Sequence, residues 1–145
     1  MKNKLASPPT RGFWIISTLA LIWNLLGVMA YIMHVTMTPE ALAALPEAER
    51  ELYTNTPAWV NGVFAIAVFA GTLGAIALLM RRTWAIHAFV LSLVAIVIQF
   101  GHSIFMSDAL AVLGPAALVF PILLLAIGAY LVLYSRAAAR NGVLR

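Results

Sequence analysis

The side chains that could do chemistry in this chain are few and mostly uncharged. The sequence has three histidines and no cysteine, so disulfides, thiolate nucleophiles and cysteine-bound metals are excluded. It contains no HExxH motif, no Ser-His-Asp set and no pair of carboxylates within an apolar stretch. Hydrolytic and acid–base enzymes depend on such arrangements. We therefore expect a protein that is not an enzyme and that holds no metal or other cofactor.

The polar residues that remain stand inside apolar stretches at a regular spacing. Steps of three and four residues place small and polar side chains on one face of a helix. One such stripe comprises Ser17, Ala20, Asn24, Gly27, Tyr31 and His34, and a second comprises Ala88, Ser92, Ala95, Gln99, His102 and Met106. Polar groups inside a membrane usually face protein or a cavity. We predict a polar lining between these two stretches, formed by Asn24, Tyr31, His34, Asn61, Gln99 and His102.

Two other interpretations of these residues stay open. Asn, Gln, Ser and His also join helices by hydrogen bonds, each contributing about 0.6 kcal/mol on average. Alternatively, His34 and His102 lie at comparable depth and could ligate a haem iron from two helices, or serve a quinone.

The elements that position these residues must be membrane helices. Of the 145 residues, 63% are apolar and 10% are charged, whereas soluble domains carry roughly 25% charged residues. A membrane helix needs about 20 largely apolar residues. Four stretches qualify, at residues 13–37, 58–80, 84–106 and 115–134. They predict an all-α integral membrane four-helix bundle in a single domain, residues 1–145, with no room for a soluble domain.

The charges predict the orientation of the spans. Eight of the nine cations flank the spans on one side, and Arg50 lies on the other side with all five acids. Because Lys and Arg are enriched in cytoplasmic loops, both termini are expected in the cytoplasm. The cations are Lys2, Lys4, Arg11, Arg81, Arg82, Arg136, Arg140 and Arg145, and the acids are Glu40, Glu47, Glu49, Glu51 and Asp108.

The loop between the first two spans carries helix signals. Thr38-Pro39-Glu40 has the composition of a helix start, and the stretch 40–52 is expected to form a short amphipathic helix interrupted at Pro46. Thr56-Pro57 repeats the cap signal before the second span. That span carries small residues (Ala67, Ala70, Gly71, Gly74 and Ala77), which allow close helix approach within the bundle. The same face is a candidate contact for a homo-oligomer or a membrane partner, and no nucleic acid is expected.

Several segments together resemble a family of short proteobacterial four-span inner-membrane proteins, often labelled "sugar transporter". They are Met37-Thr-Pro-Glu-Ala-Leu-Ala-Ala-Leu-Pro-Glu-Ala-Glu-Arg50, Pro57-Ala-Trp59, Ala67-Val-Phe-Ala-Gly-Thr-Leu-Gly74, and the Arg81-Arg82 turn with Trp84-Ala85. The resemblance implies a multi-pass protein of the bacterial inner membrane. It supplies no site residues.

These observations lead to a first hypothesis and a runner-up of another class. We expect a small membrane protein that binds or passes a small, mainly uncharged polar solute at the lining between spans one and three, because no charge lies deep in any span. The alternative is a non-catalytic accessory subunit that packs on partner helices.

Overall fold

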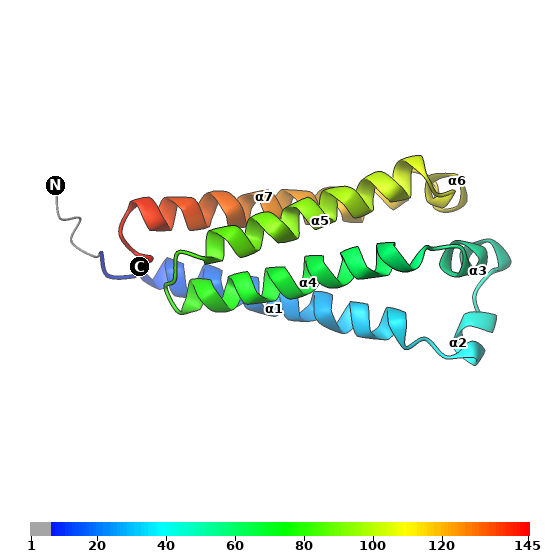
Figure 1. Ribbon diagram of the computed structural model, residues 1–145, viewed down its shortest axis with the longest axis horizontal. Helices are drawn as coiled ribbons and strands as arrows, with labels where there is room; N and C mark the ends of the chain where they lie inside the picture. The colour runs from blue at the N-terminus through cyan, green and yellow to red at the C-terminus, as the bar shows by residue number, and fades with distance from the viewer. Residues whose placement is uncertain (1–6) are drawn as a thin grey trace.

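The computed structural model describes residues 7–145, and the regular structure of this part of the chain is entirely helical. Four long helices run side by side (Figure 1). They are α1 (Arg11–Val35), α4 (Ala58–Leu79), α5 (Ala85–Phe105) and α7 (Val119–Arg140). Each is long and apolar enough to cross a membrane, the last one counted from Pro115. The predicted all-α bundle with four candidate spans is confirmed, and it indicates a small multi-pass integral membrane protein.

The helix ends follow local capping chemistry more than hydropathy. The Thr10 hydroxyl accepts a hydrogen bond from the Phe13 N–H at 3.2 Å, so α1 begins two residues before the apolar stretch. At the other extreme, α7 continues six residues beyond Tyr134 to Arg140, because the alanine-rich segment after Tyr134 favours a helix although it is less apolar.

Short helices connect the long ones at one end of the bundle. They are α2 (Pro39–Ala43), α3 (Glu47–Thr54), α6 (Ala109–Leu113) and the 3₁₀-helix η1 (Pro115–Leu118). The predicted break at Pro46 is confirmed, because Pro46 separates α2 from α3. Thr38 caps α2 by accepting from the Ala41 N–H. The cap expected at Thr56 is wrong, because its hydroxyl donates back to the Leu52 carbonyl at 2.7 Å.

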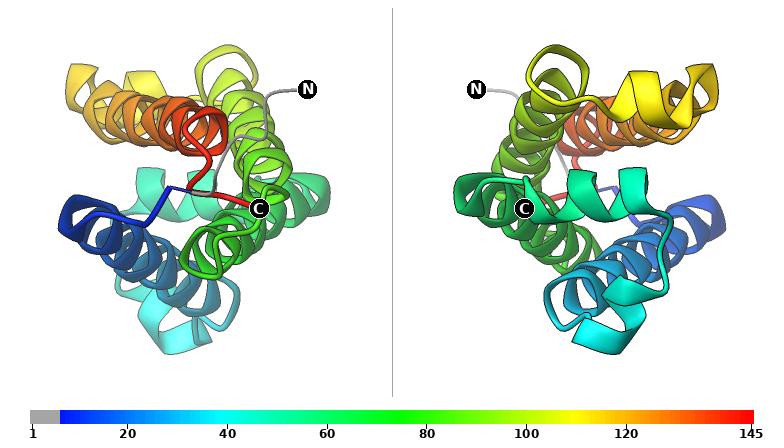
Figure 2. Two further views of the ribbon diagram at one scale, coloured as in Figure 1. Left: turned by 90° about the vertical axis from the view of Figure 1, so that its left-hand side faces the viewer. Right: turned by 90° about the vertical axis from the view of Figure 1, so that its right-hand side faces the viewer.

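The four long helices follow one another around the bundle (Figure 2). Helix α1 packs on α4, α4 on α5, and α5 on α7, whereas α1 and α7 make no comparable contact. The stripes of α1 and α5 therefore do not pack against each other along their length, as a lining between spans one and three would require. Much of both stripes faces α4 or the interior, with Ser17, Ala20, Ser92, Ala95 and His102 buried, whereas Met106 at the end of the α5 stripe is exposed.

The small residues of α4 allow both of its neighbours, α1 and α5, to pack closely on it. All five, Ala67, Ala70, Gly71, Gly74 and Ala77, are buried within the protein. A Cβ atom on Gly74 would lie 2.8 Å from the Phe89 ring of α5. A partner helix packing on this span would have to contact its exposed side chains, such as Ile66, Phe69 and Leu73.

The two ends of the bundle differ in charge. The end at which α1 begins and α7 ends (Figure 1) holds Arg11, Arg81, Arg82, Arg136, Arg140 and Arg145, and we call it the basic end. The opposite end holds the short helices, Arg50 and all five acids, and we call it the acidic end. Lys2 and Lys4, which also support the predicted orientation, lie outside the described residues.

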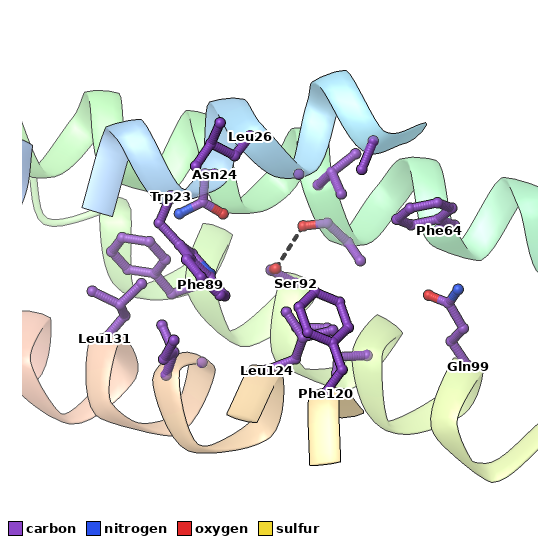
Figure 3. A pocket seen from close by; sticks show the side chains of 17 residues that line it. Trp23, Asn24, Leu26, Phe64, Phe89, Ser92, Gln99, Phe120, Leu124 and Leu131 are labelled. Carbon is purple, nitrogen blue, oxygen red and sulfur yellow. Dashed lines mark hydrogen bonds between the residues drawn. The ribbon is translucent and has the colours of Figure 1, made fainter. Parts of the chain in front are cut away.

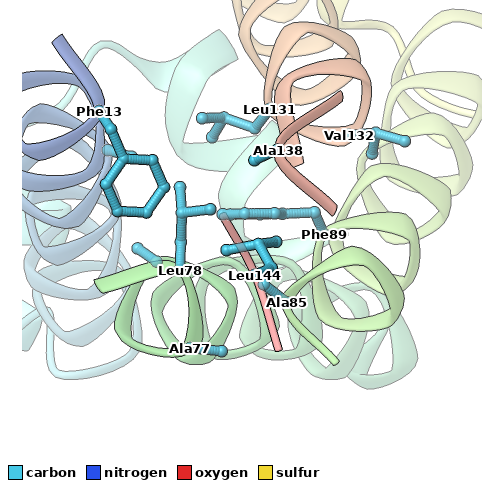
Figure 4. Packing of buried hydrophobic residues seen from close by; sticks show 11 residues of the cluster. Phe13, Ala77, Leu78, Ala85, Phe89, Leu131, Val132, Ala138 and Leu144 are labelled. Carbon is cyan, nitrogen blue, oxygen red and sulfur yellow. The ribbon is translucent and has the colours of Figure 1, made fainter. Parts of the chain in front are cut away.

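A cluster of buried side chains closes the basic end (Figure 4). Phe13, Leu78, Phe89, Leu131 and Leu144 belong to this cluster, so all four long helices and the C-terminal segment contribute to it.

Backbone hydrogen bonds hold the C-terminal segment in place. The Arg145 N–H donates to the Arg81 carbonyl at 2.7 Å, and the Thr83 N–H donates to the Arg145 carbonyl at 3.0 Å. Arg81 adopts a left-handed conformation with φ 58°. Its guanidinium donates to the Val143 carbonyl at 2.9 Å and to the Ser7 carbonyl at 3.2 Å. We call these contacts of Ser7, Arg81, Thr83, Val143 and Arg145 the basic-end clasp.

Candidate functional site

A cavity of about 310 Å³ lies among the four long helices. Phe89 and Leu131 form its floor, and both also belong to the buried cluster of the basic end. Leu26 of α1 and Phe120 of α7 line it on the side where these two helices do not pack together, and both are more than half exposed. We call this the central cavity; it opens sideways between α1 and α7.

Three polar side chains stand among the apolar walls of the central cavity (Figure 3). The Ser92 hydroxyl donates to the Ala67 carbonyl at 2.6 Å, and the Asn24 amide nitrogen donates to the Ala20 carbonyl at 2.8 Å. Within residues 7–145, the Gln99 amide has no hydrogen-bond partner. The cavity therefore offers a free amide donor and acceptor at Gln99, together with the acceptor oxygens of Asn24 and Ser92.

The side chain of Asn24 can lie against α4 because the residue of α4 that it contacts is a glycine, Gly71. A Cβ atom on Gly71 would lie 2.0 Å from the Asn24 side-chain oxygen and 3.1 Å from the Ser92 hydroxyl. Residues of α1, α4 and α5 thus meet at one point, and Gly71 leaves the space for the two polar groups to face the cavity. This is the point where the two predicted stripes come together.

The structure places Tyr31, His34 and Asn61 in a separate group nearer the acidic end. His34 and the Asn61 side-chain oxygen share a hydrogen bond of 3.1 Å, and the Tyr53 hydroxyl of α3 donates to the His34 carbonyl. The Tyr31 ring packs edge-on against Phe64, with ring centres 5.4 Å apart. These residues join α1, α3 and α4, and none of Tyr31, His34 and Asn61 lines the central cavity.

His102 lies apart from that group. Its ring packs edge-on against Trp59 of α4, with ring centres 5.3 Å apart, and it lines a second cavity at the acidic end. Trp59 and Asn61 are two residues apart on α4, so they project about 200° apart around the helix. His34 and His102 consequently contact different sides of α4, and one haem iron bound by both would require the helices to rearrange.

Of the six predicted residues, Asn24 and Gln99 line the central cavity, and the other four lie elsewhere. The sequence interpretation missed Trp23, Phe89, Phe120 and Leu124, which form much of its wall. Ser92 was in the α5 stripe but not among the candidates. Ser92 could have been identified, because it lies seven residues before Gln99 and therefore on the same face of α5. The apolar residues could not, because apolar cavity walls have the same composition as lipid-facing surfaces.

Among residues 7–145, no three His, Asp or Glu side chains lie close enough together to hold a metal ion. Comparison of the chain with protein-family models, curated proteins and solved structures finds no match. The resemblance to short four-span inner-membrane proteins stays a prediction, and function is inferred from the geometry of the residues.

Proposed function

We propose that this membrane protein binds a small, mainly uncharged molecule in the central cavity. The observation that carries the proposal is the free Gln99 amide among apolar walls, beside Asn24 and Ser92. Binding pockets for small molecules combine a mostly apolar lining with a few placed polar groups, and they typically measure about 300–1,000 Å³. The ligand is therefore amphipathic, with a hydroxyl or carbonyl group for the amides and an apolar body for the walls.

The charge of the lining favours a neutral ligand. No Asp, Glu, Lys or Arg is among the residues that line the central cavity. A charged group buried there would lose its hydration without gaining a counter-charge, which is unfavourable in a medium of low dielectric constant. The ligand we propose is thus uncharged, as predicted from the sequence, but largely apolar instead of polar.

The route of entry follows from the position of the opening. Leu26 and Phe120 flank the side of the cavity that faces away from the bundle, and exposed apolar side chains of α1 and α7 continue around it. In a bilayer this opening faces the lipid chains. A ligand dissolved in the membrane can therefore enter sideways, without crossing a layer of charged residues.

The test uses Trp23, which lines the cavity, as a reporter. A variant with Trp14, Trp59 and Trp84 changed to Phe keeps Trp23 as the single tryptophan. The purified variant in nanodiscs is titrated with 6-bromohexan-1-ol, whose bromine quenches tryptophan fluorescence on contact. Specific binding gives saturable quenching. Quenching that rises linearly with the amount of probe in the membrane would contradict the proposal.

Two controls make the result specific. The change Gln99→Leu keeps the volume and removes the amide, and it should weaken binding about 3- to 10-fold, as expected for one net hydrogen bond. The matched change Val97→Leu, at an exposed position on the same helix, should leave binding unchanged. The anion 6-bromohexanoate should not saturate the signal.

The same proposal includes a bacterial inner-membrane location with the basic end in the cytoplasm. The distribution of cations and acids between the two ends supports this orientation. The accessory-subunit alternative would instead use the exposed apolar face of α4, and no feature of that face distinguishes a partner helix from lipid.

A further inference from the structure

A second cavity, of about 340 Å³, lies at the acidic end among α3, α5 and α6. We call it the acidic-end cavity. It shares no lining residue with the central cavity, although His102 on its wall is one helical turn from Gln99. Glu51, His102 and Asp108 are among the residues that line it.

His102 is the feature of this cavity that ordinary packing does not explain. It is 8% exposed, and within residues 7–145 its side chain makes one interaction, the edge-on contact with the Trp59 ring. Neither ring nitrogen has a hydrogen-bond partner there, and neither is sealed off, because among the described residues the buried side-chain polar atom without a partner is the Ser17 hydroxyl. A neutral imidazole offers one acceptor nitrogen and one N–H donor. A buried imidazole on a cavity wall can thus bind a ligand with a group that donates a hydrogen bond.

The carboxylates of Glu51 and Asp108 supply the charge. Both residues are exposed at the edge of the cavity, and in the described part of the chain neither side chain forms a hydrogen bond or an ion pair. Arg50, the cation at this end, does not line the cavity. The lining therefore carries two negative charges and no positive charge, which favours a cation.

The size of the cavity and the spacing of its donors decide which kind of cation fits. No three of the His, Asp and Glu side chains described converge on one point, as a metal ion would require. A volume of about 340 Å³ suits a small organic molecule better than a single ion. Leu52, Pro57, Met106 and Val112 give part of the lining an apolar character.

We propose that the acidic-end cavity binds a small organic cation, a primary ammonium with a short apolar substituent. An ammonium group has three N–H donors. One of them can donate to the acceptor nitrogen of His102, the carboxylates of Glu51 and Asp108 balance the positive charge across the cavity, and the substituent lies against Met106 and Val112. This site does not depend on the ligand of the central cavity, because the two cavities have separate linings.

The experiment uses Trp59 as the reporter, because its ring contacts His102. A variant with Trp14, Trp23 and Trp84 changed to Phe retains only Trp59. In nanodiscs of zwitterionic lipid at low salt, we expect n-butylammonium to change Trp59 emission with a saturable dependence on concentration. Butan-1-ol and butyrate, which have the same length but no positive charge, should give no saturable change.

Variants then locate the binding site. The double change Glu51→Gln and Asp108→Asn keeps shape while removing both charges, and both positions are exposed, so folding should be retained. We expect binding at least about tenfold weaker, a few-fold for each partly exposed charge pair. His102→Asn should weaken it further. The control Glu40→Gln removes an exposed acid of α2 that does not line the cavity, and it should leave the affinity within about twofold.

Three outcomes would overturn the proposal. The first is equal binding of butylammonium and butan-1-ol, which needs no variant and so does not depend on their folding. The second is an equal loss of affinity in Glu40→Gln and in the double variant, which would indicate general attraction to the acidic end. The third is a saturable response to Zn²⁺ with none to butylammonium, which would identify a metal site instead.

Discussion

Asn24 faces the central cavity only because the residue opposite it has no side chain. The Asn24 oxygen occupies the space in which a Cβ atom of Gly71 would stand, and the Ser92 hydroxyl lies at the edge of the same space. One residue of α4 thus sets the position of two polar groups from two other helices. The cavity lining is correspondingly sensitive to volume at this single position.

Gly71→Ala should therefore destabilise the protein, by about 1–3 kcal/mol, as expected when an extra methyl group is forced into a packed contact. The free energy of unfolding can be measured by SDS titration in mixed micelles. Gly62→Ala is the matched control on the same helix, because a Cβ atom there meets nothing within 4 Å. It should be neutral, or stabilising by up to about 1 kcal/mol through helix propensity.

The second part of this test is a rescue. Asn24→Ala removes the side chain that the new methyl group contacts, so the double variant Gly71→Ala with Asn24→Ala should recover much of the lost stability. If Gly71→Ala and Gly62→Ala behave alike, the close contact between Asn24 and Gly71 is not a determinant of packing.

At the scale of single residues, the sequence predicted faces better than neighbours. The spacing of three and four residues predicted that Asn24 and Gln99 face the interior of the bundle, and both line the central cavity. It could not show that His34 would bond to Asn61 while His102 would contact Trp59, because heptad spacing carries no information on which helix lies opposite. Phe120 and Leu124 could not be recognised as cavity residues, since apolar side chains serve lipid and cavity equally.

The short helix α3 at the acidic end contacts the end of α1 through one side chain, Tyr53. The Tyr53 hydroxyl connects α3 to the last turn of α1 through the His34 carbonyl, a group that a helix end otherwise leaves without a partner. Pro39 and Pro46 made the start of α2 and the break before α3 predictable from sequence. The extent of α7 was not predictable from hydropathy, because its last turns are helical without being strongly apolar.

The C-terminal segment closes the opposite end, and Leu144 is its anchor. It is 5% exposed and packs in the same cluster as Phe13, Leu78 and Phe89. Nothing in the sequence marks residues 142–145 as a packed segment, because their neighbours in the turn at Arg81 are about 60 residues away. Only the folded chain brings these backbones together in the basic-end clasp.

Leu144→Ala should therefore destabilise the protein by about 2–5 kcal/mol, the range for removing a buried leucine side chain. Leu133→Ala on α7 is the matched control, because Leu133 is 64% exposed to the surroundings of the bundle. It should change the free energy of unfolding by less than about 1 kcal/mol in the same SDS titration. Equal effects of the two changes would show that the C-terminal segment contributes little to the stability of the basic end.

At the scale of the whole molecule, the opposite charges of the two ends support one orientation in the membrane. Positive charges are retained on the cytoplasmic side, so the basic end should face the cytoplasm and the acidic end the opposite side. This orientation would place the acidic-end cavity and its two carboxylates toward the outside. The central cavity would lie within the bilayer.

Cysteine labelling can test this orientation cleanly, because the natural sequence has no cysteine. Ala44→Cys, between α2 and α3, should react with a membrane-impermeant maleimide in intact bacterial cells. Asn141→Cys, directly after α7, should react only after the cells are opened. Both positions are exposed. The reverse labelling pattern would contradict the positive-inside assignment.

The basic-end clasp also determines how the bundle can move. Phe13 and Tyr134 stack at that end, with ring centres 6.4 Å apart, and they bring α1 and α7 together where the clasp holds the chain. Toward the acidic end the same two helices lack such contacts, while α1 stays packed on α4 and α7 on α5, so the two pairs could tilt apart about the basic end as a pivot. A helix of 25 residues is about 37 Å long, so a rigid tilt of about 5° at the pivot moves its far end about 3 Å. The opening of the central cavity could therefore admit ligands of different width if α1 tilts together with α4, with the contacts at the basic end preserved.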